Sequence, residues 1–187
     1  MPRASHLPHL VAVGDAEERD DDALMAAARA GDRAAFDALV RRHQRRVIGF
    51  AHKFFDHPAL ACDVAQDAFV DLLRAVPTYR ADGHFRAFLF RLTLNRCRMA
   101  ARSRRYEDGV GHALPVGETA AADREQERAV QAAMMKLTEK QREILLLRFW
   151  GGLSHDEASE ALGVPVGTVK SRLFGALEAV RALWSRR

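Results

Sequence analysis

The stretch that decides the fold spans residues 137–184 and reads "LTEKQREILLLRFWGGLSHDEASEALGVPVGTVKSRLFGALEAVRALW". It holds two pairs with the spacing of a capping box, Thr138 with Gln141 and Ser154 with Glu157. In such a box a hydroxyl and a longer polar side chain satisfy the free amides at the start of a helix. The sequence therefore predicts that one helix starts after each hydroxyl residue.

A tight turn is predicted after the second of these helices. Gly163 suits the left-handed residue that ends a helix, and Pro165 suits the start of the next one because its missing N–H costs nothing there. A second helix that begins around Val166 to Thr168 completes a helix-turn-helix, whose second helix enters the major groove of DNA. Any short helical hairpin with a solvated cationic face would share this pattern.

The last predicted helix divides into a buried and a DNA-facing surface. Helical spacing predicts burial of Val169, Leu173, Leu177, Val180 and Trp184, besides core positions upstream at Leu153, Ala158, Ala161 and Leu162. Hydroxyls and cations near the N-terminal half suit phosphates and base edges. The candidate duplex contacts are Thr168, Lys170, Ser171, Arg172 and Phe174. Gly175, directly after them, is expected to cost this helix up to about 1 kcal/mol.

Upstream, residues 63–76, "DVAQDAFVDLLRAV", are predicted to form an acidic helix. Its predicted N-cap is Asp63, and its predicted core stripe is Ala65, Ala68, Phe69, Leu72, Leu73 and Val76. Asp63, Asp67 and Asp71, here called the aspartate row, recur every fourth residue, where like charges oppose a helix by a few tenths of a kcal/mol each. Capping and an Asp71–Arg74 pair explain the row locally, and a functional acidic face explains it equally well.

Residues 85–105, "FRAFLFRLTLNRCRMAARSRR", contain seven arginines and no acidic residue. Helical spacing gathers one stripe, called the arginine stripe, of Arg91, Asn95, Arg98, Arg102 and Arg105. Within residues 85–105 it has no acidic partner three or four residues away, so intrahelical pairing there does not explain it and a polyanion does. Aromatic rings nearby suit stacked bases of a single strand. The alternative is a solvated basic face over core phenylalanines. Arg96 falls among apolar positions and is expected to extend its head to water.

The chain has 187 residues, of which 48% are hydrophobic and 29% charged, enough for two small domains. We predict an all-α fold with two small helical domains joined by a flexible linker, the second a helix-turn-helix domain. The predicted segments are a disordered arm at 1–22, a helical domain at 23–105 with breaks at "DHPA" and "PTYRADGH", a linker at 106–122 and the second domain at 123–187.

Several classes of protein are disfavoured. The net charge is +4, and no apolar run approaches the ~18 residues of a membrane span or the core of a secretory signal. We expect a soluble cytoplasmic protein without membrane insertion. The two cysteines suggest no disulfide framework. Because phosphate loops, nucleophile elbows and metal-ligand signatures are missing, we expect no enzyme activity, no cofactor and no metal site.

Four stretches carry a resemblance to a known family. They are "GDRAAFDALVRRHQRRV" at 31–47, "DVAQDAFVDLLRA" at 63–75, "YRADGHFRAFLFRLTLNRCR" at 79–98 and "LTEKQREILLLRFWGGLSHDEASEALGVPVGTVKSRLFGAL" at 137–177. In this order the chain resembles the extracytoplasmic-function (ECF) bacterial sigma factors, the initiation subunits that give RNA polymerase its promoter specificity.

The resemblance implies a role for each surface. The residues expected to bind the clamp helices of the polymerase β′ subunit are Asp63, Gln66, Asp67 and Asp71. The β flap of the polymerase is a further expected contact. The minus-10 element would be bound by Tyr79, Arg80, Arg91, Asn95, Arg98, Arg102 and Arg105, with Asn95 pocketing a flipped base. The minus-35 element would be read by Thr168, Lys170, Ser171, Arg172 and Phe174. An anti-sigma protein is implied as a further partner.

Two other classes of protein share parts of this pattern. One is a two-domain helix-turn-helix regulator that binds duplex operator DNA on its own. The other is a sigma mimic that sequesters an anti-sigma factor, which would have no need for Asn95 within a stripe of arginines. Preference for an unpaired minus-10 strand in the presence of core polymerase distinguishes a sigma factor from both.

Overall fold

The structure, a computed structural model, describes residues 20–107 and 121–185, with backbone alone for 104–107 and 121–127. Every regular element of this part of the chain is helical, which confirms the all-α prediction. The elements are α2 (Asp21–Arg29), α3 (Arg33–Phe55), α4 (Pro58–Ala75), the 3₁₀ turn η1 (Val76–Thr78), α5 (Phe85–Glu107), α6 (Ala121–Lys136), α7 (Glu139–Leu145), the π-helical turn η2 (Leu146–Trp150), α8 (His155–Leu162) and α9 (Val166–Trp184). The predicted arm and linker fall mostly outside the described residues, as does the side chain of Arg105.

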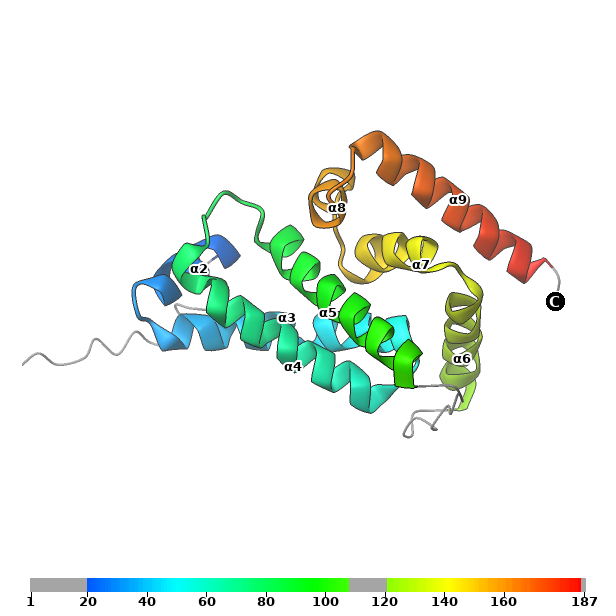
Figure 1. The fold of residues 1–187 in the computed structure, drawn as a ribbon, viewed down its shortest axis with the longest axis horizontal. Helices are drawn as coiled ribbons and strands as arrows, with labels where there is room; N and C mark the ends of the chain where they lie inside the picture. Colours follow the sequence, from blue (N-terminus) through cyan, green and yellow to red (C-terminus); the bar gives the residue numbers. More distant parts are fainter. Residues whose placement is uncertain (1–19, 108–120, 186–187) are drawn as a thin grey trace, which may run out of the picture.

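Helices α2 to α5 form one half of the molecule and α6 to α9 the other, with α8 beside the first turns of α5 (Figure 1). Both predicted capping boxes are present, at the starts of α7 and α8. Gly163 ends α8 with a φ of 66°, in the left-handed region, and Pro165 precedes α9. The helix-turn-helix is therefore formed as its turn residues predicted.

Helix α4 begins earlier than the sequence indicated. Asp56 adopts a left-handed conformation with a φ of 54° and ends α3, and Pro58 then occupies the first turn of α4. The ring Nδ1 of His57 accepts a hydrogen bond of 3.1 Å from the amide of Leu60. The prediction that Asp63 caps this helix is therefore wrong, because the proline had already started it and Asp63 lies within it.

Two core assignments are also wrong. Leu73 on α4 is 54% exposed and Trp184 on α9 is 45% exposed, although both follow the apolar spacing of their helices. Ala61 and Val64 are buried on α4, and Ala176 is buried on α9. The direction from which neighbouring helices approach thus decides which edge of an apolar stripe is covered.

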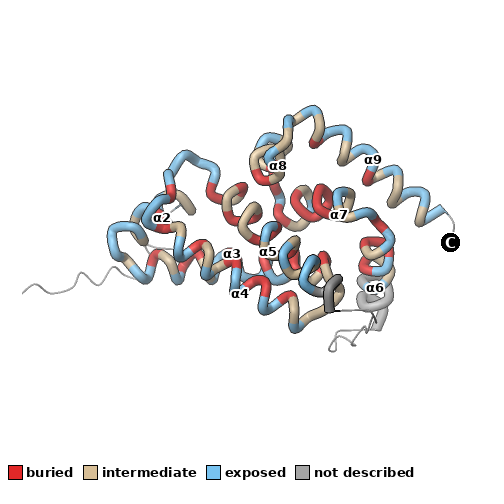
Figure 2. Tube along the Cα trace, in the orientation of Figure 1, coloured by how far each residue is buried: buried red, intermediate tan, exposed pale blue. Residues whose placement is uncertain are grey.

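The apolar core has two parts, which appear as the buried segments of Figure 2. One cluster belongs to the N-terminal half alone and includes Leu39, Leu72 and Leu89. The other joins the halves, since Phe90 and Leu94 of α5 belong to the same cluster as Ile144 near α7's end. The described part of the C-terminal half therefore has no large apolar cluster separate from the first half. No helix in 20–107 or 121–185 has the length and apolar character that crossing a membrane requires.

Candidate nucleic-acid and partner-binding surfaces

The described members of the arginine stripe are Arg91, Asn95, Arg98 and Arg102 of α5, and none of them belongs to either apolar cluster. Asn95 and Arg102 are exposed, and neither has a hydrogen bond or ion pair within the described part of the chain. Arg91 is half-buried, with its guanidinium carbon 5.2 Å from the ring centre of Phe88. An amide that can read a base edge is thus flanked by cations that can hold phosphates.

Arg98, the central arginine of the stripe, is paired with a carboxylate of the other half. Its Nε donates to Oε1 of Glu143 at 2.6 Å and its Nη2 donates to Oε2 at 2.8 Å. This bonding raises the pKa of the Arg98 guanidinium. As predicted, no partner comes from α5 itself, but α7 supplies one from 45 residues along the chain.

Arg96 differs from its prediction. Its head does not extend to water but forms a bidentate pair with Asp71 of α4, and a longer contact of 3.5 Å reaches Asp67. Arg74 also reaches Asp71, at 3.4 Å, as the sequence suggested. The hydrogen bonds from Arg96 hold the pKa of Asp71 below its usual range. The repulsion within the aspartate row is therefore partly compensated inside the protein.

The rest of the acidic surface faces solvent. Asp63, Gln66 and Asp67 are exposed, whereas Asp71 is half-buried. Val70, 42% exposed, and Leu73 lie on the same helix and were not predicted to be at the surface. An acidic helix that also presents aliphatic side chains suits a protein partner with basic and apolar groups.

Of the two loop residues predicted to bind the minus-10 element, Tyr79 is buried and Arg80 is exposed. Tyr79 is only 8% exposed, packs against the rings of Phe85 and Phe88, and donates its hydroxyl to Asp22 at 2.6 Å. Burial raises the pKa of the Tyr79 hydroxyl. Arg80 beside it is exposed. Tyr79 therefore supports the loop from within, and Arg80 is the residue of this pair that solvent can reach.

On α9 the candidate duplex contacts lie at the predicted end of the helix. Lys170, Ser171 and Phe174 are exposed, with Phe174 at 68%, while Thr168 and Arg172 are half-buried. The hydroxyl of Ser171 donates to the backbone oxygen of Thr168 at 3.0 Å. Neither Lys170 nor Arg172 is paired with a carboxylate in the described residues. This end of α9 is therefore open to an anionic ligand.

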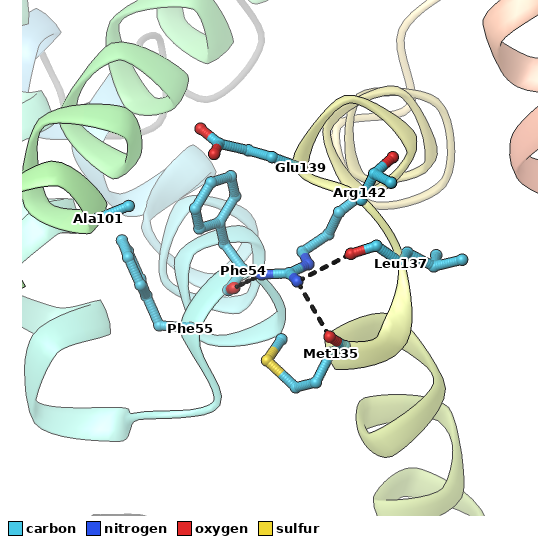
Figure 3. Close-up of a pocket in the computed structure, with 8 residues that line it drawn as sticks. Phe54, Phe55, Ala101, Met135, Leu137, Glu139 and Arg142 are labelled. Atoms are coloured by element: carbon cyan, nitrogen blue, oxygen red, sulfur yellow. Dashed lines mark hydrogen bonds between the residues drawn. The ribbon is translucent and has the colours of Figure 1, made fainter. Parts of the chain in front are cut away.

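The contact between the halves was not predicted. Arg142 of α7 donates to the backbone oxygen of Phe54 at the end of α3, at 2.8 Å, and to carbonyls at the end of α6 (Figure 3). A cavity of about 440 Å³ lies beside it, lined also by Phe55, Ala101 and Met135. Because a guanidinium has several donors, Arg142 joins helix ends that lie far apart in sequence, and no local sequence pattern could have indicated this.

Two sigma-factor family models and several sigma factors match this chain. The sigma-70 region 2 model matches residues 39–106, and the sigma-70 region 4 model matches residues 127–180. The RNA polymerase sigma-H factor of Pseudomonas aeruginosa is 34% identical over 179 residues, which are 87% of this chain and 93% of that protein. The ECF RNA polymerase sigma factor SigM of Mycobacterium tuberculosis is 35% identical over 164 residues, 87% of this chain and 83% of that protein.

Solved structures show the same fold. CnrH in complex with the cytosolic domain of CnrY has a TM-score of 0.73 and 31% identity, covering 89% of this chain and 97% of that one. The sigma factor RpoE in complex with the anti-sigma factor NepR from Bartonella quintana has a TM-score of 0.71 at 23% identity, covering 80% and 96%.

A helix-turn-helix joined to a second helix that carries cations and an exposed amide is typical of DNA-binding proteins. The two family matches and the relatives specify it further: the chain belongs to the ECF sigma factors, with most of α3 to α5 in region 2 and most of α6 to α9 in region 4. It directs promoter recognition by RNA polymerase and is not an enzyme.

Proposed function

We propose that this sigma factor uses three separate surfaces to start transcription. Asp63, Gln66 and Asp67 of α4, with Val70 and Leu73, dock on the clamp helices of the polymerase β′ subunit. Their exposure on one helix supports this role, and Asp71 contributes while holding Arg96. Region 4 meets the β flap. The proposed site of action is the cytoplasm, where bacterial RNA polymerase works.

Helix α5 captures the separated non-template strand of the minus-10 element. Asn95 hydrogen-bonds the edge of a flipped base, and Arg91, Arg102 and Arg80 hold neighbouring phosphates, with Arg98 and Arg105 in the same stripe. The observation that carries this proposal is Asn95, which is exposed, lies between Arg91 and Arg98 of the stripe and has no partner among the residues that the structure describes. Tyr79 acts indirectly, because it packs under Phe88, which in turn supports Arg91.

Helix α9 reads the minus-35 element in the major groove. Lys170, Ser171 and Phe174 are open at its N-terminal half, with Thr168 and Arg172 beside them. An inhibitory anti-sigma protein is a further proposed partner, and the relative CnrH, solved with the cytosolic domain of CnrY, supports a search for one.

Transcription in vitro with purified core polymerase on a panel of promoters tests this function. Asn95→Ala should change the preferred base at one minus-10 position, whereas Arg102→Ala should weaken all promoters similarly. Equal loss for every base with Asn95→Ala would contradict the pocket assignment. Lys170→Ala should weaken recognition of the minus-35 element. Arg181→Ala, an exposed change farther along α9, is its control and should retain minus-35 activity. A sigma mimic would support no transcription in this assay.

A further inference from the structure

Region 4 contacts helix α5 and the residue before it through three carboxylates. Besides the bidentate Arg98–Glu143 pair, Nη2 of Arg86 donates to Glu157 at 2.9 and 3.2 Å. Nδ1 of His84 lies 2.6 Å from Oε2 of Glu160. The three contacts connect one face of region 4 to region 2 over more than three turns of α5.

Glu143 has no evident role within region 4 itself. Its side chain is 4% exposed, and Arg98 is its only hydrogen-bond partner in the described residues. Burying a carboxylate is costly unless it is paired, so this position is tolerated only while Arg98 is close. Glu157 differs, since it also completes the capping box of α8.

Carboxylates and phosphates are bound by arginine in the same bidentate way. Arg98 cannot give its Nε and Nη2 donors to Glu143 and to a DNA phosphate at the same time. On α9, Lys170 and Arg172 near the N-terminal half have no carboxylate partner in the described residues, and the pair at Arg181 lies farther along the helix. The arrangement therefore withholds a cation of the minus-10 surface and leaves the minus-35 surface open.

We propose that Glu143 is an intramolecular stand-in for a minus-10 phosphate, held in place by the Arg86–Glu157 and His84–Glu160 contacts. The inference rests on the proposed strand-binding role of α5. Only a small fraction of free protein molecules then has Arg98 released from Glu143. The apparent affinity of the free protein for the strand is reduced by that fraction. In this proposal core polymerase removes the competitor by holding regions 2 and 4 on two separate promoter elements.

The test uses the full chain without polymerase and a labelled oligothymidine of about 20 nucleotides, a length that covers several phosphates. Glu143→Gln should bind it about tenfold more tightly than the unaltered chain, because the competing charge is gone. The dependence of log affinity on log salt should steepen by about 0.7, the value for one added phosphate contact on a single strand. Glu178→Gln on α9 removes the same charge elsewhere and should leave the slope unchanged.

Two further variants keep the test decisive. Glu157→Gln preserves the capping box, which accepts glutamine at this position, so it folds even where Glu143→Gln does not. Glu157→Gln should tighten oligothymidine binding by less than about fivefold, because a partly exposed ion pair such as Arg86–Glu157 contributes little. The dependence of log affinity on log salt should not become steeper. Adding Arg98→Ala to Glu143→Gln should abolish the added slope. Equal affinities and slopes for Glu143→Gln and Glu178→Gln would overturn the proposal.

The outcome also separates this inference from the proposed function. If Arg102→Ala weakens oligothymidine binding but Glu143→Gln brings no gain, the competition is refuted and the strand-binding role of α5 stands. If neither change has any effect, α5 does not hold the strand, and both are refuted.

Discussion

Helices α5 and α9 carry the cations proposed to meet the two promoter elements, yet the protein treats them differently. On α5, Arg96 and Arg98 are bound by carboxylates of α4 and α7. On α9, Lys170 is exposed and has no such partner in the described residues. The more basic of the two helices along its own sequence is α5, so the availability of a cation is decided by the element packed opposite it and not by local charge alone.

The apolar faces of α5 and α9 also differ in how far the opposite elements cover them. Shortening a buried leucine of α5 should therefore lower the free energy of unfolding more than any other change considered. Leu94 of α5 is fully buried in the cluster that joins regions 2 and 4, whereas Leu177 of α9 is only partly buried at its margin. Leu94→Ala should lower the free energy of unfolding by about 2–5 kcal/mol, because it removes contacts and leaves a cavity. Leu177→Ala should cost clearly less. Chemical denaturation of both variants measures this, and equal losses would contradict the asymmetry.

The next largest effect should come from the arginines of α5. Arg98→Ala leaves the carboxylate of Glu143 buried and unpaired, which should cost about 1–3 kcal/mol of stability because Arg98 itself is partly exposed. Arg102→Ala, in the same stripe but exposed, should stay within about 0.5 kcal/mol of the unaltered chain. Thermal denaturation compares the two. Adding Glu143→Gln to Arg98→Ala should recover part of the loss, and a double variant as unstable as the single one would show that Arg98 acts by packing alone.

The sequence contained the local information for these helices but not their mutual contacts. Hydroxyl and glutamate spacing predicted the start of α8, and Gly163 its end, because both are signals within a few residues. The partner of Arg98 and the exposure of Leu73 depend on the directions from which α7 and the other helices approach. An ion pair between residues 45 positions apart produces no periodic pattern in a single sequence. The stripe of arginines could therefore be predicted, but the pairing of Arg98 with Glu143 could not.

The stability contributed by the Arg96–Asp71 pair of α5 and α4 should depend on pH in a way that distinguishes it from the Arg181–Glu178 pair of α9. Because Arg96 lowers the pKa of Asp71 in the folded protein, this pair stabilises the fold above the ordinary carboxyl value of about 3.9. Its contribution is lost as pH falls through the lower folded value. Asp71→Asn should therefore cost up to about 1 kcal/mol near neutral pH and little in acid. Glu178→Gln, which breaks the exposed Arg181–Glu178 pair, should show no such profile when unfolding is followed across pH.

The smallest expected effect tests whether α9 is limited by its own backbone rather than by its neighbours. Gly175 lies within the helix, and a Cβ added there would meet no atom within 4 Å. Gly175→Ala should therefore stabilise the protein by about 0.5 kcal/mol, since alanine favours the helix and restricts the unfolded chain. Gly163→Ala, also without a close neighbour but at a φ of 66°, should destabilise it because L residues rarely adopt that conformation. Denaturation midpoints of the pair decide the matter, and a loss of stability in both would mean that Gly175 is needed for a contact of α9 and not merely tolerated.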